Sequence, residues 1–474
     1  MDRLPAVVGM GPGKRVERSV IEEKWALERR WAPGRGANGQ RTRPAAALAA
    51  IASCVALMVG ACAVGAAPPT AGRASPSTTA GCGPDNGLKA GRSPIILGAI
   101  VTQRPGSDFT AAGDIARAYF NCVNDNGGIN GHPVKYIVET EQTNPQQVAA
   151  LAEKLIEDDK VLALVGSFSL IDCPVNHEFY ERKGFNVIAA GVPWECFSTP
   201  NIAPVNMGPF YSSLGAAQYL IRQGATDLVV AGSNVPGGDH FISSVPEYAK
   251  EHNIPARGFF LENVPITDAG GLALKLVQAA GDGGGVVLNF TPPEGLKILQ
   301  AAEQRGLIDR VKWAWDTPGN DASVAQALGP AWNGKVGVNA ELTLVDSTGR
   351  DNTLYQQVTK RYAPSIPLSS FGQMGFLAAE IITRTLRQLP DSQLTQQGVN
   401  AAIRKIKDFR TDILCKPWYF GDLPYHVSNN ADRTVVPENH VFVQKEGCFD
   451  IAPLPSNNLD AIRQAERKKG LNGG

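Results

Sequence analysis

The segment that decides the fold is residues 95–139, which read IILGAIVTQRPGSDFTAAGDIARAYFNCVNDNGGINGHPVKYIVE. Residues 95–101 form a short apolar run, as expected of a strand that is buried on both faces of a parallel sheet. Residues 110–126 carry apolar side chains at helical spacing, and residues 134–139 form a second strand. A strand, a helix and another strand in this order predict a parallel sheet that is covered by helices.

The same alternation continues along the chain. Further strands are expected at residues 161–165, 186–190, 227–231, 256–261, 285–290, 311–315 and 335–339. Further helices are expected at residues 145–158, 172–183, 211–223, 239–251, 268–280 and 294–305. One hydrophobic core does not accommodate this many strands and helices. The pattern therefore predicts two α/β domains with parallel sheets, and a break between them near residues 204–209.

Beyond residue 339 the pattern changes. It predicts helices, at residues 351–362, 371–389 and 395–406, and then a tail of loops and short strands, including residues 416–420 and 440–444.

Charge is distributed unevenly along the 474 residues. Lys and Arg number 45, as do Asp and Glu, so the formal net charge is zero. Residues 1–43 nevertheless carry a net charge of +5, and the chain from Cys62 onward carries −5. A nucleic-acid binder needs a basic footprint, which the body lacks, so we expect no nucleic-acid partner.

The basic head leads into residues 44–67, which contain no charged residue. A basic flank followed by an apolar run is typical of a signal segment or a membrane anchor. The run ends in Met58-Val59-Gly60-Ala61-Cys62, which resembles the lipobox of bacterial lipoproteins and makes Cys62 the candidate lipidation site. Cys54 fits the same pattern, and an uncleaved single-span helix is the other alternative. Each of these possibilities places residues 82–474 outside the cytoplasm.

Residues 1–61 are longer than a typical signal peptide of roughly 15–30 residues. The first forty residues are therefore either a cytoplasmic extension or a stretch upstream of the true start. Residues 62–91 are rich in Ala, Gly, Pro, Ser and Thr, which predicts a flexible tether.

Cysteine usage fits an exported protein. The body contains six cysteines, an even number that suits an oxidising compartment: Cys82, Cys122, Cys173, Cys196, Cys415 and Cys448. Six cysteines allow fifteen connectivities, and the sequence does not choose among them. The simplest hypothesis pairs neighbours along the chain. No closely spaced ligand pair such as CxxC occurs, so we expect no metal site and no cofactor.

Catalytic motifs are absent from the sequence. Residues 166–170 (GSFSL) lack the spacing and the final Gly of a nucleophile elbow, and His177-Glu178 lacks the second His of a zinc-protease helix. A large two-domain α/β chain without a catalytic constellation is more consistent with a binding protein than with an enzyme. In such sheets, ligands bind outside the carboxyl ends of the strands.

Several motifs together resemble the type I periplasmic binding proteins, and most closely the branched-chain amino-acid (leucine/isoleucine/valine) receptors of ATP-driven importers. They are residues 96–99 (ILGA), 118–121 (AYFN), 126–134 (NGGINGHPV), 164–167 (LVGS) and 185–188 (FNVI). The resemblance implies two Rossmann-like lobes joined by a three-crossing hinge. It places lobe 1 at residues 92–207 plus 340–405, lobe 2 at 208–339 plus 406–455, and a C-terminal tail at 456–474.

The resemblance also implies where a ligand binds. In the first lobe, hydroxyls and backbone N–H groups at a helix start would hold a carboxylate, which here points to Ser167, Phe168 and Ser169. Ser169 is the best candidate, although it could simply cap the following helix. The loop after the next strand would add Ala190 and Gly191, followed by Trp194.

In the second lobe, the resemblance implies aromatic walls and an acid that pairs with an ammonium group. Tyr211 and Phe290 are the candidate aromatic residues, and Asp316 is the candidate acid, with a solvated loop aspartate as the alternative. This chain departs from the family where Thr291-Pro292 stands in a position that is commonly aromatic. The sequence therefore supports the function of a transport receptor better than it supports a branched-chain amino acid as the ligand.

We therefore expect a monomeric, lipid-anchored, solute-binding protein on the outer face of the cytoplasmic membrane. It would deliver an amino acid or similar small molecule to the permease and ATPase subunits of an ABC importer. The alternatives are a lipid-anchored sensor that signals to a membrane partner and an exported enzyme built on the same fold.

Overall fold

The computed structural model describes residues 81–83, 89–421 and 423–470. All of them belong to one compact unit, residues 74–474. The predicted basic head and signal segment, with Cys54 and Cys62, lie outside the described residues, as does most of the predicted tether. Within the described residues, no helix is both long and apolar enough to cross a membrane.

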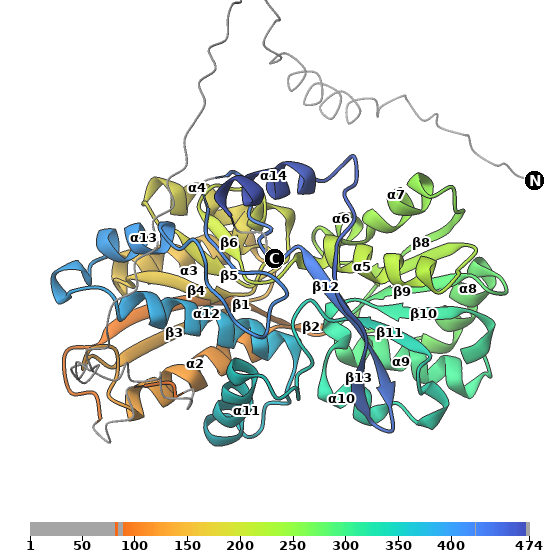
Figure 1. Ribbon diagram of the computed structural model, residues 1–474, viewed down its shortest axis with the longest axis horizontal. Coiled ribbons are helices and arrows are strands. Elements are labelled where there is room, and N and C mark those ends of the chain that lie inside the picture. The colour runs from red at the N-terminus through yellow and green to blue at the C-terminus, as the bar shows by residue number, and fades with distance from the viewer. Residues whose placement is uncertain (1–80, 84–88, 422, 471–474) are drawn as a thin grey trace, which may run out of the picture. The chain divides into compact units, whose positions relative to one another are not determined.

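The first sheet has six strands, and its order is β2-β1-β4-β5-β6, with β3 also paired to β1 (Figure 1). Its strands are β1 (Ile95–Arg104), β2 (Ser107–Asp108), β3 (Val134–Glu141), β4 (Ala163–Ser167), β5 (Val187–Ala189) and β6 (Ile202–Pro204). Every pairing in it is parallel except that of the short β2 with β1.

Helices flank this sheet (Figure 1). They are α2 (Thr110–Asp125), α3 (Pro145–Glu153), the π-helical turn η2 (Lys154–Asp158), α4 (Asp172–Arg182), η3 (Trp194–Cys196), α11 (Arg350–Tyr362), α12 (Ser370–Leu386), η7 (Asp391–Gln393) and α13 (Gln396–Arg404). The most extensive helix pair is α2 with α12, and α12 also packs against β4.

The second sheet has seven strands in the order β13-β12-β11-β10-β9-β7-β8. They are β7 (Leu228–Ser233), β8 (Ala256–Glu262), β9 (Gly285–Asn289), β10 (Lys312–Trp315), β11 (Val336–Asn339), β12 (Ala431–Glu438) and β13 (Val441–Asp450). The strands from β7 to β11 pair in parallel, whereas β12 is antiparallel to both of its neighbours.

The remaining helices lie between residues 208 and 332, apart from α14 near the C-terminal end of the described residues. They are α5 (Gly208–Arg222), α6 (Gly238–Ile242), α7 (Ser244–Glu251), α8 (Ala269–Ala280), α9 (Pro292–Gln304), η4 (Ile308–Arg310), η5 (Thr317–Gly319), α10 (Ala322–Ala327), η6 (Pro330–Trp332) and α14 (Leu459–Lys469). Helix α5 packs against β9, β10 and β11.

The chain passes between the two sheets three times. It leaves the first sheet after β6, returns to it through α11 and α12 after β11, and joins the second sheet again at β12. The predicted fold, with two α/β lobes and a three-crossing hinge, is therefore confirmed. The sheets are mixed rather than purely parallel, because β2, β12 and β13 run antiparallel to their neighbours.

The turn between α2 and β3 explains why its sequence is so rich in Gly and Asn. Gly127, Gly128, Asn130 and Gly131 all have positive φ angles. Gly adopts this backbone conformation without steric cost, and Asn tolerates it better than most residues. The turn reverses the chain within a few residues and delivers β3 beside β1.

Some elements differ from the expectation. Residues 416–420 do not form a strand, since the only ladder contact there is an isolated bridge between Phe409 and Trp418. The apolar pattern arises because Trp418 and Phe420 are buried, and the Trp418 indole donates to the Pro204 carbonyl over 2.8 Å. The helix expected at 239–251 is divided into α6 and α7 at Ser243.

Three disulfides join the six body cysteines in the sequential pairing of the simplest hypothesis: Cys82–Cys122, Cys173–Cys196 and Cys415–Cys448. The second bridge ties the start of α4 to η3, so it holds together the loops that follow β4 and β5. These two loops lie at the carboxyl ends of neighbouring parallel strands.

Candidate functional site

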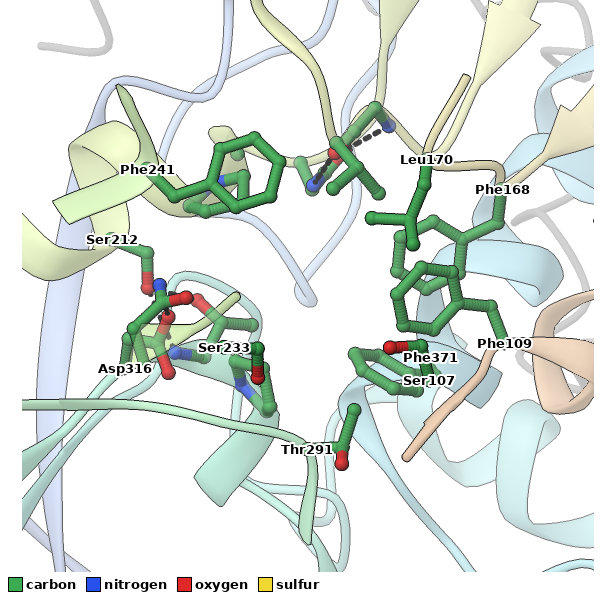
Figure 2. Close-up of a pocket in the computed structure, with 18 of the residues that line it drawn as sticks. Ser107, Phe109, Phe168, Leu170, Ser212, Ser233, Phe241, Thr291, Asp316 and Phe371 are labelled. Carbon is green, nitrogen blue, oxygen red and sulfur yellow. Dashed lines mark hydrogen bonds between the residues drawn. The ribbon is translucent and has the colours of Figure 1, made fainter. Parts of the chain in front are cut away.

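A cavity lies at the carboxyl ends of strands from both sheets (Figure 2). From the first-sheet side it is lined by Ser107, Phe109, Phe168, Leu170, Gly191, Val192, Asn206, Phe371 and Met374. From the second-sheet side it is lined by Gly208, Pro209, Ser212, Ser233, Val235, Phe241, Asn289, Phe290, Thr291, Asp316, Thr317, Pro318 and Glu341. This is the position at which open α/β sheets bind ligands.

The cavity is small. The volume that the centre of a water-sized sphere can occupy is about 70 Å³. Because one water molecule needs roughly 10–15 Å³ on this measure, the space holds several waters or a small organic molecule.

Asp316 is the most unusual group in the cavity wall. It follows β10, its side chain is 1% exposed, and one carboxyl oxygen, Oδ2, accepts a hydrogen bond from the Asn289 amide. The other oxygen, Oδ1, is buried and has no hydrogen-bond partner in the described structure. Burial, reinforced by the nearby Glu341, raises the pKa of Asp316 well above its ordinary value.

Glu341 is the second acid in the wall. It follows β11 and is buried, and its Oε2 accepts hydrogen bonds from the Met207 backbone N–H and from Asn429. Burial raises the pKa of Glu341 to about 7. No Lys, Arg or His is among the described residues that line the cavity, so the acids have no basic partner there.

Three phenyl rings form the opposite wall, as Figure 2 shows. Phe109 precedes α2, Phe168 follows β4, and Phe371 lies in the first turn of α12. The rings of Phe109 and Phe168 stack with centroids 4.4 Å apart, and Phe371 meets Phe168 edge-on at 4.9 Å. This arrangement offers an apolar ligand both ring faces and ring edges. We call these three residues the phenyl cluster.

Three hydrogen-bond donors near the phenyl cluster are already used within the protein. The Ser169 hydroxyl donates to Glu141 over 2.8 Å, and the Leu170 N–H donates to Thr102 Oγ1 over 2.9 Å. In the next loop, the Gly191 N–H donates to the side-chain oxygen of Asn206 over 2.7 Å. An anion that used these three donors would therefore have to compete with existing bonds.

Residues 99–431 match the sequence profile of a family described as periplasmic binding protein. The chain belongs to this family. Membership of this family implies that the protein is a binding protein and that it works outside the cytoplasm.

Solved structures share the fold of this periplasmic binding protein. One is a branched-chain amino-acid ABC transporter protein from Thermus thermophilus with bound valine, at 16% identity and a TM-score of 0.67, over 76% of this chain and 98% of that chain. Another is a solute-binding protein from R. palustris in complex with benzoate, at 14% identity and a TM-score of 0.63, over 77% and 98% of the two chains.

A curated relative is an amino acid binding protein from Pseudomonas aeruginosa, which is 33% identical over 69 residues. That stretch is 15% of this chain and spans only 18% of the relative's length. This relative therefore adds a local likeness to the family assignment, and its ligand class is not carried over by so short a match.

Four of the nine residues predicted to bind ligand line the cavity of this periplasmic binding protein, namely Phe168, Gly191, Phe290 and Asp316. Ser167, Ser169, Ala190, Trp194 and Tyr211 are not among its lining residues. The Ser169 hydroxyl accepts from the Asp172 N–H at the start of α4, which is the helix-capping role given as its alternative. Asp316 is buried, so the alternative of a solvated loop aspartate is wrong.

The other predicted residues have identifiable surroundings. Ser167 Oγ accepts from the Ile100 N–H, and the Ala190 N–H donates to the Ser167 carbonyl. The Trp194 ring contacts His240 at 5.3 Å between centroids. The Tyr211 hydroxyl is buried without a partner in the described structure, and burial raises the pKa of Tyr211 above its usual range.

Sequence reasoning missed much of the cavity wall. Ser233, Asn289 and Glu341 stand at or just after the ends of parallel strands, so the rule that ligands bind at those ends could have found them. Phe109 and Phe371 carry no such signal, because they come together only when α2 packs against α12. Among the described residues, no group of three or more His, Cys, Asp or Glu side chains could hold a metal ion.

Proposed function

We propose that this periplasmic binding protein is a receptor that captures a small solute between its two lobes and delivers it to an ABC importer. One observation carries the proposal: the cavity is walled by strand ends from both sheets, so a bound solute would contact both lobes at once. Binding between two lobes favours a closed conformation, which a membrane partner can recognise.

The comparisons support this class of function. The neighbours that share the fold bind valine in one case and benzoate in another. Their sequence identities to this chain are 16% and 14%, so they support solute capture without specifying the solute. We also keep the proposed lobe boundaries, with lobe 1 at 92–207 plus 340–405 and lobe 2 at 208–339 plus 406–455.

The test of solute capture is a thermal-shift screen of the exported protein with amino acids, amides, amines and small carboxylic acids. A solute at 100 times its Kd stabilises the folded state by about 2.7 kcal/mol. We expect at least one compound class to raise the melting temperature by several degrees. If no solute raises it, the proposal is wrong.

Delivery needs a separate test in cells. Deleting the gene should abolish uptake of the identified radiolabelled solute, and a plasmid copy should restore uptake. Unchanged uptake in the deletion strain would contradict delivery and favour the alternative of a lipid-anchored sensor.

We further propose that Cys62 is lipidated and holds the protein, as a monomer, on the outer face of the cytoplasmic membrane. The tether predicted at residues 62–91 must then end before Cys82, because a disulfide joins Cys82 to Cys122 of α2. Replacing Cys62 by Ala should abolish labelling of the protein with radioactive palmitate in growing cells. The matched variant Cys54→Ala should leave the labelling unchanged. If the two variants behave in the opposite way, Cys54 is the anchored residue.

A further inference from the structure

The two walls of the cavity differ in chemistry. Figure 2 shows Asp316 and Ser212 on one side and Phe109, Phe168 and Phe371 on the other. A ligand that satisfies both walls has one polar end and one apolar end. This inference rests on the proposed function and concerns the chemical class of the solute.

The polar wall calls for a hydrogen-bond donor. Asp316 Oδ1 is a buried oxygen without a partner in the described structure, in a side chain that is 1% exposed. A buried carboxyl oxygen without a donor is costly, and a ligand N–H group would remove that cost. Glu341 in the same wall adds a second acid, and no described basic side chain lines the cavity.

The opposite wall does not suit a carboxylate. Phe109, Phe168 and Phe371 are buried phenyl rings, and the nearby donors of Ser169, Leu170 and Gly191 already have acceptors within the protein. A carboxylate placed there would lose its hydration without gaining a positive charge, because no described basic side chain lines the cavity.

We propose that the cavity selects a small ammonium compound with an apolar body and no carboxylate. Its ammonium group donates to Asp316 Oδ1, and its apolar body packs against the phenyl cluster. The class therefore differs from the free amino acids, which carry a carboxylate as well.

The charges around Asp316 agree with a cationic ligand. Glu341 faces it from the chain after β11, and beyond Glu341 lies the buried Asp432 of β12, with Arg433 next to Asp432. Burial raises the pKa of Asp316 well above its ordinary value. Binding of an ammonium ion therefore forms an ammonium–carboxylate pair, and the proton of the Asp316 carboxyl group leaves to solvent.

Binding that releases this proton must depend on pH. The affinity for an amine rises with pH, by at most about tenfold per pH unit while one proton is released. A neutral ligand leaves the Asp316 carboxyl group protonated, so its affinity shows no such rise. The pH dependence thus separates an ammonium ion from a neutral donor.

The experiment compares four probes of similar size by isothermal titration calorimetry of the exported protein. Isopentylamine carries only the amine, L-leucine carries amine and carboxylate on the same branched chain, 4-methylpentanoate carries only the carboxylate, and isopentanol is neutral. We expect isopentylamine to bind at least about tenfold more tightly than each of the others.

The variant Asp316→Asn tests the contact itself. We expect it to weaken isopentylamine binding at least about 30-fold and to abolish the rise with pH. The matched control is Glu380→Gln, because Glu380 is also a buried carboxyl with an unpartnered oxygen and a raised pKa, yet it does not line the cavity. Glu380→Gln should bind isopentylamine with unchanged affinity and pH slope.

Specific outcomes would overturn the inference. L-leucine or 4-methylpentanoate binding as tightly as isopentylamine would show that a carboxylate is accepted, and equal binding of isopentanol would show that charge is not recognised. If none of the four probes binds while another solute in the screen does, the ammonium assignment is wrong and solute capture stands. If no solute in the screen binds, the proposed function itself fails.

Discussion

At the scale of single residues, Asp172 shows how burial changes the chemistry of a carboxyl group. It lies in the first turn of α4, and its Oδ1 accepts from Asn176 and from the Tyr180 hydroxyl at 2.8 and 2.6 Å. Burial raises the pKa of Asp172 to about 6 in spite of these bonds. The folded protein therefore holds this proton more tightly than the unfolded chain does.

A group of this kind stabilises the fold below its unfolded pKa of about 3.8, and the stabilisation is lost as the pH rises through about 6. We expect Asp172→Asn to remove this dependence. Between pH 4.5 and 7.5, the free energy of unfolding of the variant should gain about 2 kcal/mol relative to the unmodified protein. Urea titrations of both proteins at both pH values measure this gain. If the unfolding free energies of the two proteins differ by the same amount at pH 4.5 and at pH 7.5, Asp172 does not titrate in this range.

Gly128 allows a second prediction at this scale. It has a φ of +69°, and a Cβ atom there would overlap the His132 carbonyl and the Ala90 side chain. Gly184 has a similar φ of +72°, but a Cβ atom at Gly184 would meet nothing within 4 Å. We expect Gly184→Ala to cost about 1 kcal/mol of stability, and Gly128→Ala at least about 3 kcal/mol, because overlap adds to strain. Equal costs in urea unfolding would contradict the role of close packing at this turn.

At the scale of elements, the disulfide between Cys173 and Cys196 joins two loops that line the cavity. The loop after β4 contributes Phe168 and Leu170, and the loop after β5 contributes Gly191 and Val192. The bridge closes a loop with a sequence separation of 23 residues. A bridge of this span stabilises a protein by about 3 kcal/mol in the chain-entropy model.

Replacing both of these cysteines by Ala should therefore lower the free energy of unfolding by about 3 kcal/mol and also weaken isopentylamine binding about threefold to tenfold, since both loops would have to be ordered on binding. The control is the Cys415–Cys448 pair, which has a separation of 33 residues and does not line the cavity. Its double Ala variant should lose similar stability with unchanged affinity. Unchanged binding in the first variant would show that the bridge does not organise the cavity.

Strands that are buried on both faces of a sheet were predictable from the sequence, but a buried loop was not distinguished from them. The apolar runs that became β1, β4, β7 and β9 are buried on both faces of their sheets, so their composition alone identified them. The segment 416–420 (KPWYF) ends in three large apolar or aromatic residues, but it is a loop in which Trp418 and Phe420 are buried against the core. The composition of a segment indicates that its side chains are buried, but it does not indicate which backbone groups form the hydrogen bonds of a sheet.

At the scale of the whole molecule, the cavity was only partly predictable. Asp316 and Phe168 follow strands, so the general rule for parallel sheets located them. The phenyl cluster depends on a helix that returns to the first sheet after the second sheet is complete, since Phe371 belongs to α12. Its partner Phe109 is 262 positions earlier in the chain, and one sequence contains no signal for such a long-range contact.

The contact between Thr291 and Gly106 leads to a prediction about closure of the two lobes. The Thr291 hydroxyl, after β9 of the second sheet, donates to the carbonyl of Gly106, between β1 and β2 of the first, over 3.2 Å. This bond joins the two lobes at Thr291, which lines the cavity, so it requires the lobes to be together. Removing it should therefore weaken ligand binding without changing the stability of each lobe.

We expect Thr291→Val, which keeps the shape of the side chain, to weaken isopentylamine binding about threefold to tenfold, as one hydrogen bond is worth about 0.5–1.5 kcal/mol. The melting temperature without ligand should stay the same. Thr226→Val is the control, because the hydroxyl of the exposed Thr226 donates to the neighbouring Asp227 and lies outside the cavity. Equal affinities of the two variants, measured by calorimetry, would mean that this bond does not hold the closed state. Since the bond lies away from Asp316, Thr291→Val should also leave the pH dependence of amine binding intact, which separates closure of the lobes from recognition of charge.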